Sequence, residues 1–577
     1  MAAVPSSSPA PETLMDAMKR QDWPGARRAA LSVLAREPDH LTALALLGEC
    51  EMNLGRVACA WAPLNRCVRL GGQFVHRILL AICLRRLKRH PEAHRQRDLA
   101  ASAVPHSAMA YFLLANSFES DGLHERARAY YEHARALNPA DGVILHRLGC
   151  CLVILGEPEQ ACIHLRDACS ADMTNANYHT DYSSALAGCG RFEDARLEAE
   201  TATLLSPASR VAYHNLGHAL LNLDRSEDAV AAFDRALDIL PTEPRTRFSR
   251  STALLKAGNF AEGWKDYEYR WQDCQVMRTD LSAPLWQGED LHGKSILLHG
   301  EQGFGDSLQF IRFAEELNRR GAHVTAQVGF PLVRLFESVH GVARAMTVLP
   351  PGLRFDYHLP MASLPYRLGL TPDTIPSAPY LFVEEKEIER QGGAVRRHMT
   401  QGSQTPDLVV GLVWAGEARK HQPRAHLVDR RRSMPLESLR PLFSVEGLRF
   451  CSFQLGDAKQ QIGTSGLPVV DVTDGIGDFA DTAARLFGID LLIAVDTSIV
   501  HLAGGLGLPV WMISRADGCW RWLEKRSDTP WYPTMHIFRQ TSPGDWNDVA
   551  EQLRARLFRW SNTYRRMRFD RMEMAAK

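Results

Sequence analysis

A spacing of 34 residues runs through the first half of the chain and limits what that half can fold into. Four sets of positions repeat at this interval: Pro105, Pro139, Pro207 and Pro241; Gly122, Gly156, Gly190 and Gly258; Ala93, Ala127, Ala161, Ala195 and Ala229; and Ala134, Ala168, Ala202 and Ala236. A period of this length is typical of two antiparallel helices that bury their apolar faces only by stacking on neighbouring pairs. Proline suits the end of the second helix, and glycine suits a turn that needs positive φ. The sequence therefore predicts a helical solenoid.

The segment 209–241 is the cleanest copy of the repeat, and it resembles the tetratricopeptide consensus. We expect six or seven such units between about 39 and 274, and a weaker helical pair over 11–37. The predicted solenoid thus covers 11–274, after a short disordered lead over 1–10.

Composition excludes several classes of protein. Lys and Arg together number 67, and so do Asp and Glu together. The formal net charge is therefore zero and does not favour binding to nucleic acid or to an anionic membrane. The 12 cysteines form no CxxC pair and no zinc or iron–sulfur spacing, so we expect buried thiols and no metal. This usage fits a reducing, cytoplasmic compartment. No apolar run is long enough to predict a membrane span.

The pattern changes after a turn-rich stretch at 280–293, and strands then alternate with helices, which predicts parallel sheets covered by helices. We expect a first lobe over 280–395, a polar linker, a second lobe over 406–562 and a tail over 563–577. The expected strands are Ser295–His299, His323–Val328, Ala345–Leu349, Tyr357–Pro360, Leu408–Trp414, Leu448–Phe453, Asp490–Val495 and Pro509–Ile513. The expected helices are Asp306–Arg320, Leu332–Val339, Glu384–His398, Leu436–Phe443, Phe479–Phe487, Ser498–Gly505 and Trp546–Phe558. The predicted fold class is an α-solenoid followed by two Rossmann-like lobes.

A glycine-rich loop between the first of these strands and its helix is one candidate site. Gly303 and Gly305 let the backbone approach a ligand, and the start of the helix favours an anion or a polarised hydroxyl. Asp306 follows them. It is interpreted equally well as a helix cap or as a functional acid.

A second candidate lies where a strongly apolar strand turns into a helix. Asp496, Thr497 and Ser498 stand at the junction, and their hydroxyls and the free N–H groups of the helix suit a diphosphate. His501 lies one turn further, either in a ligand site or as a buried histidine bonded to a backbone carbonyl.

Two further segments could serve such a site. The basic loop from Arg419 to Ser433 could neutralise a departing phosphate, or it is simply a solvated loop. The aromatic segment from Trp520 to Pro533 could stack on a base or sugar, but we favour a role in fixing the loop against its lobe.

Taken together, these segments resemble the heptosyltransferase-like enzymes of the glycosyltransferase B fold, in particular bacterial proteins that fuse tetratricopeptide repeats to such a domain. The segments that carry the resemblance are GEQGFGDSLQF, FDYHLPMASLP, VGLVWAG, DRRRSMPL, DFADTAA, VDTSIVHLAGGLGLPVW and DTPWYPTM. One departure is Cys519, where relatives usually carry an aspartate before the Trp-Arg-Trp triplet.

The resemblance implies roles for particular residues. Asp306 would be the catalytic base, and Asp496, Thr497, Ser498 and His501 would bind the diphosphate and sugar of the donor. Lys420 or an arginine of 430–432, such as Arg432, would neutralise phosphate. Gln454 would line the nucleoside pocket.

By this resemblance the chain is a sugar-nucleotide-dependent glycosyltransferase, inverting and free of metal and cofactor, whose repeats bind a polypeptide acceptor or partner. Two alternatives stay open: a repeat scaffold whose transferase domain has lost turnover, and a heptosyltransferase acting on a lipopolysaccharide core. The sequence identifies neither nucleotide, sugar nor acceptor, and it leaves open whether the repeats self-associate.

Overall fold

The computed structural model describes residues 14–273, 281, 283–301, 303–376, 379–401, 408–418 and 423–576. The chain divides into two compact units, Met1–Cys189 and Gly190–Lys577. The disordered lead predicted for 1–10 and residues 402–406 of the polar linker predicted for 400–406 lie outside the described residues.

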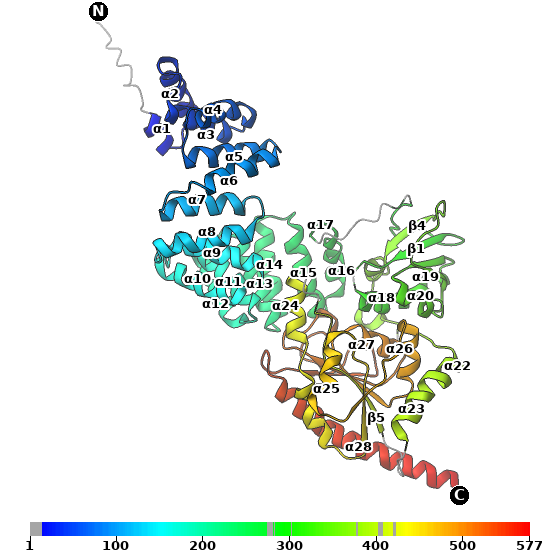
Figure 1. Ribbon diagram of the computed structural model, residues 1–577. Helices are drawn as coiled ribbons and strands as arrows, with labels where there is room; N and C mark the ends of the chain where they lie inside the picture. Colours follow the sequence, from blue (N-terminus) through cyan, green and yellow to red (C-terminus); the bar gives the residue numbers. More distant parts are fainter. Residues whose placement is uncertain are drawn as a thin grey trace, which may run out of the picture. The chain divides into compact units, whose positions relative to one another are not determined.

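The first unit is entirely helical in its described part. Its helices are α1 (Leu14–Lys19), α2 (Trp23–Arg36), α3 (Leu41–Asn53), α4 (Val57–Arg69), α5 (Phe74–Arg86), α6 (His90–Ala101), α7 (Ala108–Glu119), α8 (His124–Leu137), α9 (Gly142–Leu155), α10 (Pro158–Ala171) and α11 (Ala176–Gly188). Consecutive helices pack as pairs, and each pair stacks on the next, as Figure 1 shows for α3–α10. This is the predicted solenoid.

The repeat positions do what the spacing predicts. All nine alanines of the two alanine sets are fully buried, as close helix packing requires. The glycines between paired helices have positive φ, for example 82° at Gly156 and 86° at Gly258. Where glycine is missing, Asp224 takes the same conformation with φ 54°, so the backbone keeps the turn even at a steric cost.

The second unit opens with the remaining repeat helices: α12 (Phe192–Leu205), α13 (Arg210–Asn222), α14 (Ser226–Ile239), α15 (Pro244–Lys256), α16 (Phe260–Tyr267) and the short α17 (Arg270–Asp273). Gly217 on α13 faces the ring of Phe233 on α14, and a Cβ at Gly217 would lie 2.7 Å from that ring. Phe233 is fully buried, so glycine here allows the two helices to close over a large side chain.

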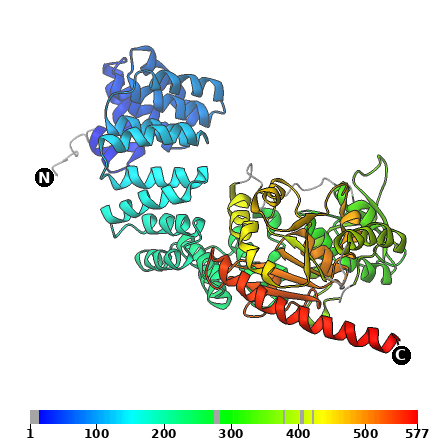
Figure 2. The ribbon, with the colours of Figure 1, turned by 60° about the horizontal axis from the view of Figure 1, so that its bottom comes forward.

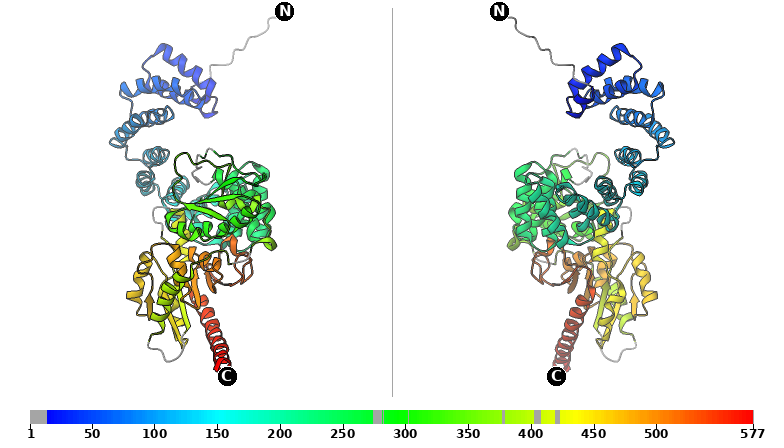
Figure 3. Two further views of the ribbon diagram at one scale, coloured as in Figure 1. Left: turned by 90° about the vertical axis from the view of Figure 1, so that its right-hand side faces the viewer. Right: turned by 90° about the vertical axis from the view of Figure 1, so that its left-hand side faces the viewer.

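A four-stranded parallel sheet follows, with strand order β3-β2-β1-β4. Its strands are β1 (Ser295–His299), β2 (His323–Gln327), β3 (Val342–Met346) and β4 (Tyr357–Pro360). The helices around it and toward the next lobe are α18 (Phe304–Phe310), α19 (Ala314–Arg319), α20 (Phe330–Phe336), α21 (Leu364–Arg367), α22 (Glu385–Glu387) and α23 (Gly393–Thr400). Figure 3 shows this sheet in green, apart from the yellow-to-orange strands of the second one.

A six-stranded parallel sheet forms the second lobe, with order β10-β9-β8-β5-β6-β7. Its strands are β5 (Leu408–Val413), β6 (Leu448–Ser452), β7 (Val469–Asp471), β8 (Leu491–Val495), β9 (Val510–Ser514) and β10 (Met535–Arg539). The helices of this lobe are α24 (Pro423–Arg432), α25 (Gln461–Ser465), α26 (Phe479–Leu486), α27 (Ser498–Gly505) and α28 (Trp546–Ala576). Both faces are buried, as expected of a parallel sheet. Helix α28 packs on one face through Val549, Leu553 and Leu557 (Figure 2).

Several predicted elements need correction. The helix predicted over Asp306–Arg320 is broken by a 3-10 turn at Ile311–Phe313 into α18 and α19. The segment 423–432, predicted as loop, is helix α24. The predicted closing helix does not stop at Phe558 but continues through the region predicted as a tail.

The repeats do not end as a separate body before the first sheet. Phe260 and Trp264 on α16 belong to the same buried cluster as Phe310 of the first lobe and Trp531 of the second. The Trp264 ring lies 5.1 Å from Trp520 and 6.1 Å from Phe310, both edge to face. The fold class changes near 280 as predicted, but the hydrophobic core runs across that point.

None of the helices in the described ranges combines the length and apolar character that a bilayer span requires.

Replacing Phe233 by alanine tests the packing of the repeats. The substitution removes a fully buried ring beside Gly217, and we expect the free energy of unfolding to fall by about 3–5 kcal/mol, measured by urea denaturation followed by circular dichroism. Leu204→Ala is the control, because Leu204 is 81% exposed and its truncation should change stability by less than about 0.5 kcal/mol. Equal effects would mean that Phe233 is not a core residue.

Candidate functional site

The strand order of each sheet points to a position where a ligand would bind. In the first sheet the chain moves from β1 outward to β2 and β3, and then returns to place β4 on the other side of β1. In the second sheet β5 and β8 are the strands at which the order reverses. Doubly wound sheets bind ligands beyond the carboxyl ends of the strands at such a reversal. The glycine-rich loop follows β1, and Asp496–Ser498 follows β8, so both predicted segments lie at these positions.

Helices α18 and α27, which begin at these two positions, contact each other. A Cβ at Gly305 would lie 3.0 Å from Cδ2 of His501 and 3.7 Å from Cα of Ser498. A side chain at position 305 would therefore crowd His501 of α27. The predicted loop glycine thus serves contact between the two lobes.

Asp306 faces the second lobe. The N-cap of α18 is Gly303, and no side chain caps this helix, so the cap interpretation of Asp306 is wrong. Its carboxylate is paired with the guanidinium of Arg521, which stands 215 residues further along the chain. Both side chains are mostly buried, 20% exposed for Asp306 and 12% for Arg521.

Arg521 is held by several other contacts. It donates through Nε to the Gln309 side chain at 2.6 Å and through Nη1 to the sulfur of Cys519 at 3.2 Å. Burial lowers the pKa of Arg521, but its interactions with Asp306, Cys519 and Tyr267 together outweigh burial and raise this pKa above its ordinary value. Cys519, which stands where the resembled enzymes carry an aspartate, thus accepts a hydrogen bond from the arginine that pairs with the candidate base Asp306.

The junction between β8 and α27 gathers polar groups. One carboxylate oxygen of Asp496 accepts a hydrogen bond of 2.9 Å from Nε1 of Trp522, and the Asp496 carbonyl accepts one of 3.3 Å from Arg432. The hydroxyl of Thr497 donates to the carbonyl of Val495 at 3.3 Å. Ser498 is the first residue of α27. A helix start and a guanidinium lie together here, which is chemistry suited to a phosphate.

His501 is a buried, neutral side chain. Its Nδ1 lies 2.8 Å from the hydroxyl of Tyr532, and its ring stacks on Trp522. Burial, and then the positive charges of Arg521 and Arg312, hold the pKa of His501 well below its usual range. The histidine is bonded to a tyrosine hydroxyl and not to a backbone carbonyl as the simpler interpretation expected.

Gln454 is used to hold the ends of two strands together. Its side-chain oxygen accepts from the backbone N–H groups of Trp414 and Ala415 at 3.1 and 2.9 Å, and its nitrogen donates to the carbonyls of Ala415 and Leu455. It is buried, 3% exposed. Its amide therefore shapes the loop after β5.

The basic segment contributes one residue to this region. Lys420 lies outside the described residues. Arg432 reaches the Asp496 carbonyl and also donates to Asp429 at 2.9 Å. Arg431 instead packs over the ring of Phe192 of α12, and burial lowers the pKa of its guanidinium. The solvated-loop interpretation is therefore wrong for these two arginines.

The aromatic segment fixes its loop, as favoured from the sequence. Trp522, Trp531 and Tyr532 are fully buried, and Trp520 is 7% exposed. Trp531 packs against Phe260 and Phe310, so these rings are occupied by other side chains of the protein.

Sequence reasoning missed the anchor of the glycine-rich loop. Glu301, buried to 2% exposure, accepts two hydrogen bonds of 2.8 Å from Arg270 of α17, which also donates to Ser363. The Arg270 side chain is fully buried. Glu301 belongs to the glycine-rich segment GEQGFGDSLQF, but no neighbouring residue in the sequence indicated that its partner would be an arginine of the repeats.

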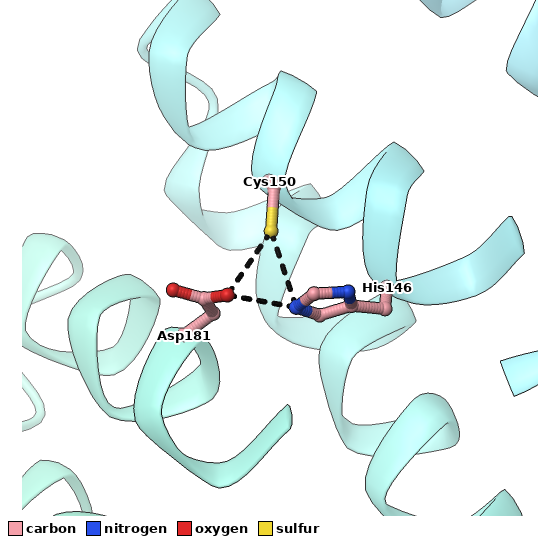
Figure 4. A group of neighbouring side chains, drawn as sticks. All are labelled: His146, Cys150 and Asp181. Atoms are coloured by element: carbon pink, nitrogen blue, oxygen red, sulfur yellow. Dashed lines mark hydrogen bonds and ion pairs between the residues drawn. The ribbon is translucent and has the colours of Figure 1, made fainter. Parts of the chain in front are cut away.

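Among the described residues, a group of side chains suited to a metal ion lies away from this region, in the first unit. His146 and Cys150 of α9 meet Asp181 of α11 (Figure 4). Position 181 is 34 residues after position 147, so the two positions are equivalent in neighbouring repeats. The period could therefore have predicted that Asp181 lies near His146, although no CxxC spacing indicates a metal site here.

Comparison with known proteins identifies the repeats. A tetratricopeptide repeat family matches residues 14–73, 79–142 and 184–244. The N-terminal region of this chain therefore carries tetratricopeptide repeats, in agreement with the helical pairs described above.

Two curated proteins are similar to this chain. Protein FlbA of Caulobacter vibrioides is 26% identical over 502 residues, 81% of this chain and 81% of its own. The Hsp70-Hsp90 organizing protein of Triticum aestivum is 26% identical over 176 residues, 30% of this chain and 29% of its own. The first match is too long to be confined to the repeats.

Among solved structures, the Cut9 complex with Hcn1 from the APC/C is 16% identical, covering 42% of this chain and 48% of its own, with a TM-score of 0.36. MamA of Desulfovibrio magneticus RS-1 is 18% identical, covering 31% and 99%, with a TM-score of 0.27.

A double-mutant cycle tests the pair at the centre of the site. Arg521→Met leaves the mostly buried Asp306 carboxylate unpaired, and we expect Asp306→Asn in the same chain to recover part of the loss, with a coupling energy of about 1–3 kcal/mol in denaturant unfolding. The exposed pair Arg526–Asp528, 38% and 66% exposed, is the control and should couple by less than about 1 kcal/mol. A coupling no larger than in the control would show that Asp306 and Arg521 are not paired in solution.

Proposed function

We propose that the second unit is a glycosyltransferase that uses a sugar nucleotide as donor. The observation that carries the proposal is the meeting of two helix starts, α18 with Asp306 and α27 with Asp496–Ser498, each at the reversal point of its own parallel sheet. Two facing sites of this kind suit a reaction between two substrates, one held by each lobe.

The donor would bind on the second lobe. The N–H groups at the start of α27 would receive the diphosphate, with Thr497 and Ser498 adding hydroxyls. Arg432, already at the Asp496 carbonyl, would stabilise the charge that develops on the leaving nucleoside diphosphate. Cationic and backbone donors would thus serve the leaving group without a metal ion.

The acceptor hydroxyl would attack the anomeric carbon in a single displacement with inversion. Asp306 would take the hydroxyl proton, the bond to the diphosphate would break, and its electron pair would leave with the nucleotide. Asp306 must first exchange its contact with Arg521 for the acceptor. The freed guanidinium would then face the developing negative charge.

The repeats would bind the acceptor or a partner. Tetratricopeptide repeats support protein interaction, and stacked helical pairs offer an extended surface for a polypeptide. A polypeptide acceptor is therefore the substrate class that we propose.

One observation favours a second candidate, a repeat scaffold with a transferase-like domain that no longer turns over. The acid that would act as base is occupied by an arginine, and that arginine is bound by Cys519, where the resembled enzymes carry an aspartate. An acid and arginine locked in this way would stabilise the join between the lobes.

Nucleotide binding and transfer distinguish the two candidates. We expect one nucleoside diphosphate in a panel of uridine, guanosine, adenosine and cytidine forms to raise the Tm, because a ligand of the native state stabilises it. Arg432→Gln should reduce this shift, whereas Arg440→Gln, on the exposed surface, should retain it. Asp306→Asn should keep the shift but lower sugar transfer or sugar-nucleotide hydrolysis by about 10²-fold or more.

Absence of both nucleotide stabilisation and turnover in the wild-type chain, with peptide binding by the repeats preserved, would reject the enzyme and favour the scaffold. Turnover unchanged in Asp306→Asn would reject the role of Asp306 as base.

A further inference from the structure

Three side chains of different chemistry converge on one point between neighbouring repeats of the first unit. His146 and Cys150 are one turn apart on α9, and Asp181 projects from α11 to meet them, as Figure 4 shows. Nε2 of His146 lies 2.7 Å from Oδ2 of Asp181, and the Cys150 sulfur lies 3.5 Å from each of these two atoms.

These separations are close to those of ligands around a tetrahedral metal. Bond lengths of about 2.0 Å to nitrogen or oxygen and about 2.3 Å to sulfur place tetrahedral ligand atoms roughly 3.3–3.8 Å apart. Both distances from the sulfur lie in this range. The distance from nitrogen to oxygen is that of a hydrogen bond and has to open by about half an ångström. A change of this size needs only side-chain movement of Asp181.

The donor set selects the kind of metal. Imidazole, thiolate and carboxylate are the three ligand types that Zn²⁺ uses, whereas a thiolate disfavours Ca²⁺ and Mg²⁺. Three protein ligands leave a fourth position, and the Asp181 side chain is 42% exposed, so this position can be reached from solvent.

The surroundings keep the site in shape. The ring of His146, 14% exposed, packs at 4.7 Å from the ring of Tyr178 on α11, which restricts its rotation. The Cys150 thiol donates to the carboxylate of Asp181 at 3.5 Å. The trio is thus a satisfied hydrogen-bonded group that a cation can convert into a metal site.

We propose that His146, Cys150 and Asp181 bind one Zn²⁺ ion, with water or a donor from a bound partner as fourth ligand, and so clamp α9 to α11. The site links consecutive repeats, and it does not depend on the function proposed for the second unit.

Cobalt binding to the full-length protein tests the proposal. After treatment with a chelator, titration with Co²⁺ should produce a sulfur-to-cobalt charge-transfer absorption, and added Zn²⁺ should displace it with a stoichiometry of one per chain. Cys150→Ser should abolish this absorption, and His146→Gln and Asp181→Asn should weaken Zn²⁺ binding by more than about tenfold. Zn²⁺ should also raise the Tm of the wild type more than that of these variants.

Cys59→Ser is the matched control, because Cys59 is an exposed thiol on α4, and it should bind cobalt and zinc like the wild type. Because the Asp181 side chain is partly exposed, we expect the Asp181→Asn variant to stay folded, and circular dichroism checks this. No charge-transfer band in the wild type, or equal Zn²⁺ affinity in the wild type and all three variants, would overturn the proposal.

Discussion

The second unit depends on one cluster of aromatic rings. Trp264 of the last repeat pair packs edge to face on Trp520, and Trp531 lies between Phe260 of the repeats and Phe310 of the first lobe. Each buried ring of this size removes about 150–250 Å² from water. Because one cluster serves the repeats and both lobes, it fixes the position of the segment that carries Arg521, and hence the contact of Arg521 with Asp306.

Much of the fold follows from local pattern. The 34-residue spacing predicted the helical pairs, and β1 and α27 have the bounds that apolar runs and flanking turn residues indicated. The pattern failed where local signal is weak. Strand β7 is only three residues long, and α24 is rich in arginine and lacks the apolar spacing of an amphipathic helix.

The candidate site was predictable in its parts but not in its pairings. The segments around Asp306 and Asp496 were identified from glycine, acid and hydroxyl residues after predicted strands. The partner of Asp306 was not, because an ion pair across 215 residues is set by tertiary packing. Gln454 and His501 were expected as ligands from the family resemblance, and the structure places them within hydrogen-bonding reach of the loop after β5 and of Tyr532.

The anchoring of the glycine-rich loop by Arg270 has an evolutionary consequence. Helix α16 supplies aromatic rings to the core of the first lobe, and α17 supplies the buried arginine that anchors its glycine-rich loop. These two helices therefore cannot be replaced when the other repeats are replaced. Recombination could lengthen, shorten or replace the repeats on their N-terminal side, where each pair contacts only its neighbours. Descendants of this chain would therefore vary in the reach of the array while inheriting its last pair together with the lobes.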